Sequence, residues 1–299
     1  SKDTYTSYVD TGLDVKFYPV KIEKDNLISN LVFFTCGNSP CKNGRINIIA
    51  EDLSGNFVVY EKKIKTLSNR DWKTTNMIID LDFLLSKYNE IFKEDISSVS
   101  IDNFFELNKK LRNENDNEIS SNTKVISKKL ITSGKFYQMK NSKVFSRYSE
   151  KRNYYLKNDD KLLMSTYHWG YDLSSIKNAK VYPSSEGIVN YINKDGLGIY
   201  GKTVIINHGL GFYTLYSHLS EISVDVGSRV EVDTVIGTTG ETGLAFGDHL
   251  HFGTYLQGAP FNSSEIWDKK YFNQKVLNTY NNFLKSNSSA KVDRMKPEM

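Results

Sequence analysis

Cysteine is scarce in this chain of 299 residues, in which Cys36 and Cys41 are the only two. One pair excludes a disulfide-rich scaffold, and the first 167 residues contain no histidine that could complete a metal site with it. The Gly-Asn-Ser-Pro between the cysteines predicts a tight turn, which would bring the sulfurs together in an oxidising compartment. Two unpaired thiols are the alternative that the sequence leaves open.

Long apolar runs are also missing. No stretch approaches the about 18 residues that a membrane-spanning helix needs. The first ten residues are polar and lack the apolar part of a signal peptide. The sequence therefore predicts no membrane span. Either the protein is cytosolic, or a signal or anchor has been removed before Ser1.

A large excess of charge of one sign is missing as well. The 39 basic and 35 acidic residues give a net charge of +4, too weak over this length to demand a polyanionic partner. Residues 135–161 contain eight basic and three acidic side chains, but residues 162–268 contain five basic and eleven acidic ones. Affinity for nucleic acid comes largely from basic side chains that neutralise phosphates. Because residues 162–268 are acidic, we expect no nucleic-acid partner.

Glycine is absent between Gly55 and Gly134, whereas 14 of the 19 glycines lie between Gly170 and Gly258. This asymmetry, in a chain longer than one core usually organises, predicts several domains. Short alternating apolar runs predict a small β-sandwich within residues 1–70. In residues 71–131, apolar side chains spaced by three and four predict a helical linker.

Beyond Gly187 the apolar period changes to two, as in KTVIIN, FYTLYSH and HLHFGTYL. This period predicts antiparallel strands, so residues 132–268 are expected to form a β domain. We expect a final helix to begin near Asn262, where Glu265 three residues on resembles a capping box, and to continue into the C-terminal region 269–299, with a disordered tail after Ser286. The expected fold class is mainly β and multi-domain.

The five histidines all lie in the glycine-rich half, and such clustering indicates a common cause: His168, His208, His218, His249 and His251. His249-Leu-His251 is the sharpest element, because residues i and i+2 of a strand point to the same face and the intervening Leu points into the core. A His-x-His pair also occurs by chance in strands, so by itself it is only a moderate indication of metal binding or catalysis.

A histidine and a carboxylate lie four residues apart in His168-Trp-Gly-Tyr-Asp172, where Gly170 favours a loop or an extended segment over a helix. Together with one imidazole of the His249/His251 pair, they make a three-ligand set from which a hydrolytic Zn²⁺ keeps a fourth position open for water. The other imidazole of that pair and His218 are then free to transfer protons.

In order and spacing, four segments resemble the lysostaphin/LytM family of zinc metalloendopeptidases, the M23 peptidases: HWGYD, GKTVIINHGLGFYTLYSHLS, VGSRVEVDTVIGTTGETG and FGDHLHFG. The resemblance runs from about Ser146 to Asp268 and implies a LytM-type peptidase domain with a groove. It implies that the Zn²⁺ ligands are His168, Asp172 and His251. It also implies that the catalytic pair is His218 and His249.

Weaker likenesses lie upstream. SRYSEKR and NFFELNKKLRNENDNEI resemble envelope-associated members with an N-terminal domain, and RINIIAEDLSGN resembles an Ig-like strand pair. At one position the chain departs from the family, because Ser149 stands where members usually have glycine. We expect a local backbone change there that leaves the zinc chemistry intact.

Four other polar residues lie in or beside these motifs. We expect a structural hydrogen bond at His208 and a solvated turn at Asp248. Tyr167 and Tyr200 flank the motifs and are expected to line the substrate groove.

The implied function is hydrolysis of peptide bonds in the stem or cross-bridge peptides of bacterial peptidoglycan, in the periplasm or outside the cell. One alternative is a non-catalytic M23-like activator or scaffold of another cell-wall hydrolase, although degenerate modules of that sort lack some of the five site residues. Another is a metal-storage site, which leaves His218 and His249 without a role. Loops 153–166, 193–199 and 237–247 are expected to determine which bond is cut.

Overall fold

The computed structural model describes residues 5–24, 27–37, 44–64, 73–93, 101–157 and 162–289. Strands predominate among them and pair mostly antiparallel, which confirms the expected mainly β fold class. The central sheet has the order β17-β13-β14-β15-β19-β11-β8, with β20 paired to β19. Its strands are β8 (Lys143–Ser146), β11 (Tyr171–Ser174), β13 (Gly187–Asn193), β14 (Lys202–Gly209), β15 (Phe212–Leu219), β17 (Arg229–Val230), β19 (Leu250–Leu256) and β20 (Ala259–Pro260).

Two sheets precede the central one in the chain. A four-stranded sheet has the order β2-β1-β5-β6, and its strands are β1 (Tyr5–Asp10), β2 (Lys16–Phe17), β5 (Arg45–Asp52) and β6 (Phe57–Lys63). A two-stranded sheet pairs β3 (Val20–Lys24) with β4 (Leu27–Leu31). Cys36 is disulfide-bonded, and Cys41, the other cysteine of the sequence, lies outside the described residues.

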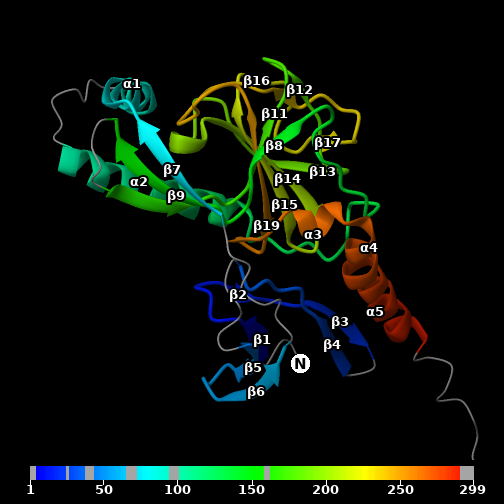
Figure 1. The fold of residues 1–299 in the computed structure, drawn as a ribbon. Coiled ribbons are helices and arrows are strands. Elements are labelled where there is room, and N and C mark those ends of the chain that lie inside the picture. Colours follow the sequence, from blue (N-terminus) through cyan, green and yellow to red (C-terminus); the bar gives the residue numbers. More distant parts are fainter. Residues whose placement is uncertain are drawn as a thin grey trace, which may run out of the picture.

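Two smaller sheets flank the central one. The first has the order β10-β9-β7, with β7 (Thr74–Ile79), β9 (Lys151–Leu156) and β10 (Leu162–Tyr167). The second has the order β12-β18-β16, with β12 (Lys180–Val181), β16 (Glu221–Ile222) and β18 (Gly237–Thr238). The helices are α1 (Leu81–Phe92), α2 (Ile101–Asn122), α3 (Ser264–Trp267), α4 (Lys269–Phe272) and α5 (Asn278–Ser289), with a π turn at Asn273–Leu277 and a 3₁₀ turn at Gly198–Tyr200. Figure 1 places β1–β6 on one side of the central sheet and α1, α2, β7 and β9 on another.

The region 71–131, expected to be a helical linker, contains strand β7 ahead of its two helices. β7 is rich in β-branched residues and pairs in parallel with β9, a contact over 70 residues away in the chain that helical spacing cannot reveal. Asp80 ends the strand and caps α1, because its side chain accepts from the backbone N–H groups of Asp82 and Phe83. Helices α1 and α2 therefore lie in the segment predicted to be helical, and strand β7 ahead of them was not predicted.

The C-terminal helix is interrupted where continuous helix was expected. Asp268 has extended backbone and begins α4 by accepting from the N–H groups of Lys270 and Tyr271. At the expected capping box, Asn262 instead accepts from the N–H of Ser264. Helix α5 continues past Ser286 to Ser289, so the expected disorder does not begin at Ser286, and the rest of the expected tail lies outside the described residues.

Three apolar clusters hold these elements together. One joins the N-terminal strands to the central sheet and α4, through residues such as Val9, Phe17, Phe212 and Phe272. A second joins α1 and α2 to β14 and β15, through residues such as Tyr88, Phe104, Ile205 and Leu215. The third includes Leu250, which lies in the core as its place between two histidines predicted. Because these clusters cross 70 and 131, the division of the chain at 70, 131 and 268 stays a prediction.

None of the described helices combines the length and the apolar character that a membrane crossing requires.

Candidate active site

Two imidazoles and a carboxylate converge at the edge shared by β11 and β19. Asp172 and His251 are directly paired across these strands, so their side chains leave the same face of the sheet. His168 joins them from the turn between β10 and β11. The Oδ1 of Asp172 lies 2.9 Å from Nε2 of His168 and 3.0 Å from Nδ1 of His251, and the two nitrogens are 2.9 Å apart. All three residues are buried.

Gly170 provides the space for this convergence. A Cβ atom at this position would lie 2.5 Å from the carbonyl oxygen of Phe252 and 2.7 Å from both Cε1 and Nε2 of His251. Any side chain would therefore displace the imidazole or the strand. The glycine between His168 and Asp172 is needed for close approach.

Backbone carbonyls determine which nitrogen faces the site in three of its four histidines. A carbonyl oxygen only accepts, so the nitrogen beside it carries the proton. Nδ1 of His168 donates to Arg147 at 3.0 Å, that of His218 to Thr242 at 2.8 Å, and that of His249 to Gly247 at 2.7 Å. Each neutral ring thus keeps an unprotonated Nε2.

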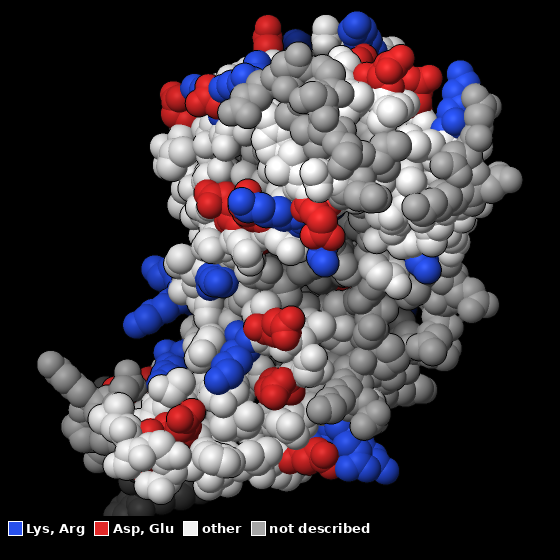
Figure 2. Space-filling model, turned by 90° about the vertical axis from the view of Figure 1, so that its left-hand side faces the viewer, with Lys and Arg blue, Asp and Glu red and all other residues white. Residues whose placement is uncertain are grey.

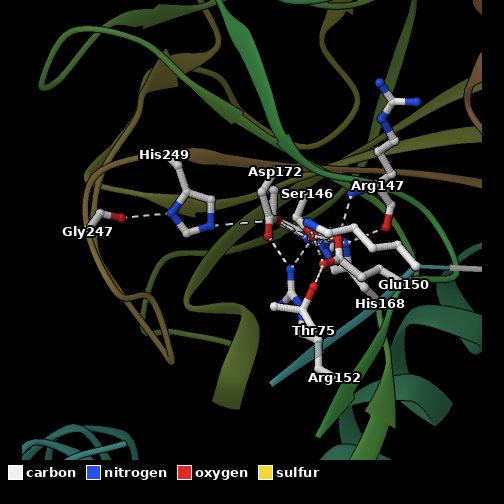
Figure 3. A network of polar contacts seen from close by, with 11 residues as sticks. Thr75, Ser146, Arg147, Glu150, Arg152, His168, Asp172, Gly247 and His249 are labelled. Carbon is white, nitrogen blue, oxygen red and sulfur yellow. Dashed lines mark hydrogen bonds and ion pairs between the residues drawn. The ribbon is translucent and has the colours of Figure 1, made fainter. Parts of the chain in front are cut away.

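His218 and His249 lie beside the convergent cluster. Their ring centroids are 4.8 Å apart, and the ring of His218 is 5.9 Å from that of His251. Nε2 of His249 is 3.6 Å from Oδ1 of Asp172, and Figure 3 shows His249 pointing toward that carboxylate. His218 has a φ of 61°, a left-handed conformation that is uncommon outside glycine and tends to occur at functional sites.

Burial and neighbouring charges shift the pKa values of Asp172 and the histidines around it in different directions. Burial alone would raise the pKa of Asp172, but the imidazoles around it, His168 first, hold it well below its usual value. Burial lowers the pKa of His251 to about 4, and burial with the neighbouring imidazoles holds the pKa of His218 well below its usual range. Burial acts in the same direction on His249, but the hydrogen bond and charge of Asp172 outweigh it and raise that pKa. Asp172 is therefore held as an anion, and burial favours the neutral form of His218 and His251.

A cavity of about 60 Å³ opens onto the cluster. It is lined by Arg112, Arg152, Tyr154, Thr166, Tyr167, His168, Trp169, Ile199, Tyr200, His218, Leu244, Phe246 and His251. Helix α2 contributes Arg112, so the region before 131 reaches the site. Tyr167 and Tyr200 both lie on the wall, the first half exposed and the second buried with its ring 5.5 Å from that of His251.

His208 and Asp248 lie away from the cluster. His208 is fully buried, and its nitrogens contact the carbonyl of Glu186 and the hydroxyl of Thr214, both at 2.7 Å. Asp248, expected in a solvated turn, is half-buried and accepts from the hydroxyl of Thr239 and the N–H of Asn178. Asp248 therefore links the segments around Thr239 and Asn178 by these two hydrogen bonds and is not a solvated turn residue.

Ser149 adopts a φ of 65°, in the region that favours glycine. Its N–H donates to the carbonyl of His168 at 2.7 Å, so the departure from the family pattern preserves a turn that supports this histidine.

Sequence reasoning missed Arg152. Its Nη2 lies 2.5 Å from Oδ2 of Asp172 and donates to the hydroxyl of Ser146 at 2.8 Å. The available signal was the last of the three basic residues in SRYSEKR, but the charges around it resembled those of a solvated loop. Only the pairing of distant strands brings Arg152 to Asp172.

Comparison with known proteins supports the resemblance. Residues 166–263 match the model of Peptidase family M23. The DD-carboxypeptidase/endopeptidase Mpg of Neisseria meningitidis is 38% identical over 99 residues, which cover 33% of this chain and 22% of the relative. The peptidoglycan DD-endopeptidase ShyA of Vibrio cholerae is 35% identical over 96 residues, which cover 32% and 22%. The chain thus spans about a fifth of the length of these curated relatives.

Among solved structures, the catalytic domain of lysostaphin from Staphylococcus simulans is similar. It is 23% identical, with a TM-score of 0.34, over 42% of this chain and 90% of that one.

Proposed function

We propose that this chain, in which residues 166–263 match the model of Peptidase family M23, is a zinc-dependent endopeptidase that hydrolyses stem or cross-bridge peptides of peptidoglycan. The observation that carries the proposal is the convergence of two imidazoles and a carboxylate beside two further imidazoles. In this proposal the ligands are His168, Asp172 and His251, and the catalytic pair is His218 and His249. The name of the similar Vibrio protein, a peptidoglycan DD-endopeptidase, supports peptidoglycan as the substrate, and a peptidoglycan substrate would place the protein in the cell envelope.

The residues present fit Zn²⁺. Two nitrogens and one carboxylate oxygen are a common catalytic zinc set, and tetrahedral bonds of about 2.1 Å separate ligand atoms by about 3.4 Å, close to the 2.9–3.0 Å edges found here. Nδ1 of His251 faces two acceptors, and its Nε2 is buried without a hydrogen-bond partner among the described residues. A cation among the three atoms would compensate this concentration of lone pairs.

Bound Zn²⁺ supplies Lewis acidity, which activates water and polarises a carbonyl. The chain's own residues handle the protons. One Nε2 of the His218 and His249 pair accepts the proton of the attacking water and passes it to the leaving amine. The other takes up a proton from solvent at its Nε2 and then donates a hydrogen bond to the oxyanion. Proton transfer of this kind contributes about 10² to 10⁴ in rate.

The face shown in Figure 2 gives no support to a polyanionic partner, because its described Lys and Arg side chains lie among Asp and Glu side chains. Peptide recognition fits this mixed surface better than a phosphate backbone does.

Digestion of purified sacculi and of defined cross-linked muropeptides tests the proposal. We expect cross-linked dimers to give monomers whose masses identify the cleaved bond, and Asp172→Ala to release none. A zinc-loaded wild-type protein that leaves every cross-link intact would contradict an endopeptidase and favour the non-catalytic activator or scaffold.

A further inference from the structure

Arg152 contacts the oxygen of Asp172 that faces away from the histidines. Its Nη2 is 2.5 Å from Oδ2, whereas Oδ1 is the atom within 2.9–3.6 Å of His168, His249 and His251. The Arg152 side chain is 21% exposed and that of Asp172 is 7% exposed, so water screens the pair little. Figure 3 shows the guanidinium directed at this carboxylate.

We propose that Arg152 is a positioning residue, which occupies Oδ2 of Asp172 and so presents Oδ1 alone to the metal cluster. This inference rests on the proposed function, because it assigns Arg152 to the same site. With Oδ2 free, the carboxylate could rotate and offer both oxygens, which would change the coordination and the separation of the ligand atoms.

Arginine suits this task better than lysine. The two N–H groups of Nη2 serve two acceptors at once, Oδ2 of Asp172 and the hydroxyl oxygen of Ser146 at 2.8 Å. A planar guanidinium fixes both directions, whereas an ammonium group is a rotating point charge. Hydrogen-bond partners of metal ligands typically change metal affinity or activity by about 10- to 100-fold when removed.

The same contacts extend to a second ligand. The hydroxyl of Ser146 lies 3.3 Å from Nδ1 of His168 and donates to Glu150 at 2.5 Å. Glu150 is buried, accepts from the hydroxyl of Thr75 on β7, and lies 3.4 Å from the ammonium of Lys73. Ser146 at the end of β8 therefore contacts His168, and Arg152 in β9 contacts Asp172. Glu150, in the turn between these strands, links Ser146 to Thr75 of β7.

Zinc affinity provides the test, with Arg152→Met, Arg152→Lys and the control Arg147→Met. Arg147 lies in the turn before β9, but its side chain is exposed and points away from the cluster (Figure 3), and its contact with His168 is made by the backbone carbonyl. Apo proteins are titrated with Zn²⁺ against a chelating indicator. Visible spectra of the Co²⁺-substituted proteins report the coordination number.

We expect zinc affinity to fall about 10- to 100-fold in Arg152→Met and about 10-fold in Arg152→Lys, with weaker visible Co²⁺ bands and no change in Arg147→Met. A folded Arg152→Met with wild-type affinity and spectrum would overturn the proposal. If that variant does not fold, Arg152→Lys decides, and wild-type affinity there would overturn it too. A wild-type protein that binds no zinc would instead refute the proposed function itself.

Discussion

The hydrogen-bond partners of each histidine set its chemical role. Both nitrogens of His208 are occupied inside the protein, so no nitrogen is left for a substrate or a metal. In His218 and His249, a carbonyl occupies Nδ1, and Nε2 stays available beside Asp172 and His251. One residue type thus forms a structural bridge in one place and, in the proposed mechanism, accepts a proton in another.

We expect His218→Ala and His249→Ala to keep about one zinc per chain and to lose about 10² to 10³ in kcat, because they remove proton-handling groups and leave the three ligands in place. Metal analysis and muropeptide turnover on the same preparations check this. His208→Gln is the control and should keep both properties. Loss of zinc in His218→Ala would make it a ligand, and wild-type turnover in either alanine variant would remove that residue from the mechanism.

His208 should also make stability depend on pH. Burial lowers its pKa from 6.5 to about 4, so the unfolded chain takes up a proton below about 6.5 that the folded protein takes up only below about 4. The free energy of unfolding therefore falls as the pH drops through this window, by up to about 3 kcal/mol. Urea unfolding between pH 7 and pH 4 should show a smaller fall in His208→Gln. Equal falls would mean that His208 is not a buried neutral group.

At the scale of elements, some of the site follows from local pattern and some does not. Alternation within one strand predicted that His249 and His251 share a face, and both contact the same oxygen of Asp172. The contact between Arg152 and Asp172 depends instead on how separate strands are placed in space. Strand β7 was misassigned for the same reason, since its partner β9 begins at Lys151. The periodicity of a sequence predicts which face of a strand or helix a side chain lies on, but not which distant strands lie beside it.

The turn between β10 and β11 gives an element-scale prediction. Gly170→Ala should weaken zinc binding about 10-fold or more, because the added Cβ meets the imidazole of His251 and the carbonyl of Phe252. Gly227→Ala is the control. A Cβ there meets nothing within 4 Å, although φ is +86°, so it should lose some stability and keep its zinc affinity. Wild-type affinity in Gly170→Ala would show that the turn tolerates a side chain.

At the scale of the whole molecule, the helices before 131 belong to the site. Arg112 of α2 lines the cavity, and Asn115 of α2 accepts from the N–H of Ile199 at 2.9 Å. Lys87 of α1 donates to the carbonyl of Glu241 at 2.8 Å. The cavity of about 60 Å³ is far smaller than the several hundred Å³ that ligand sites usually offer, so we expect that binding of the proposed peptide substrate requires these segments to separate.

Weakening the contact between α1 and the loop that contains Phe246 should therefore ease access of the substrate to the cavity. The ring of Phe83 in α1 stacks on that of Phe246 at 5.3 Å, and Phe83→Ala removes this stack. We expect kcat/KM on muropeptides to rise several-fold with unchanged zinc content. Phe57→Ala is the control, because Phe57 is 66% exposed on β6 in the N-terminal sheet. An unchanged or lower kcat/KM in Phe83→Ala would show that α1 does not restrict access.

Zinc titration of the apo protein, followed by cleavage of a cross-linked muropeptide, tests the central claim most directly. The account predicts that wild-type activity rises in proportion to added zinc and stops rising at one equivalent per chain. At the same zinc concentrations, Asp172→Ala should bind no zinc and show no activity. Full cleavage by the metal-free protein, or an Asp172→Ala variant as active as the wild type at one equivalent, would contradict it.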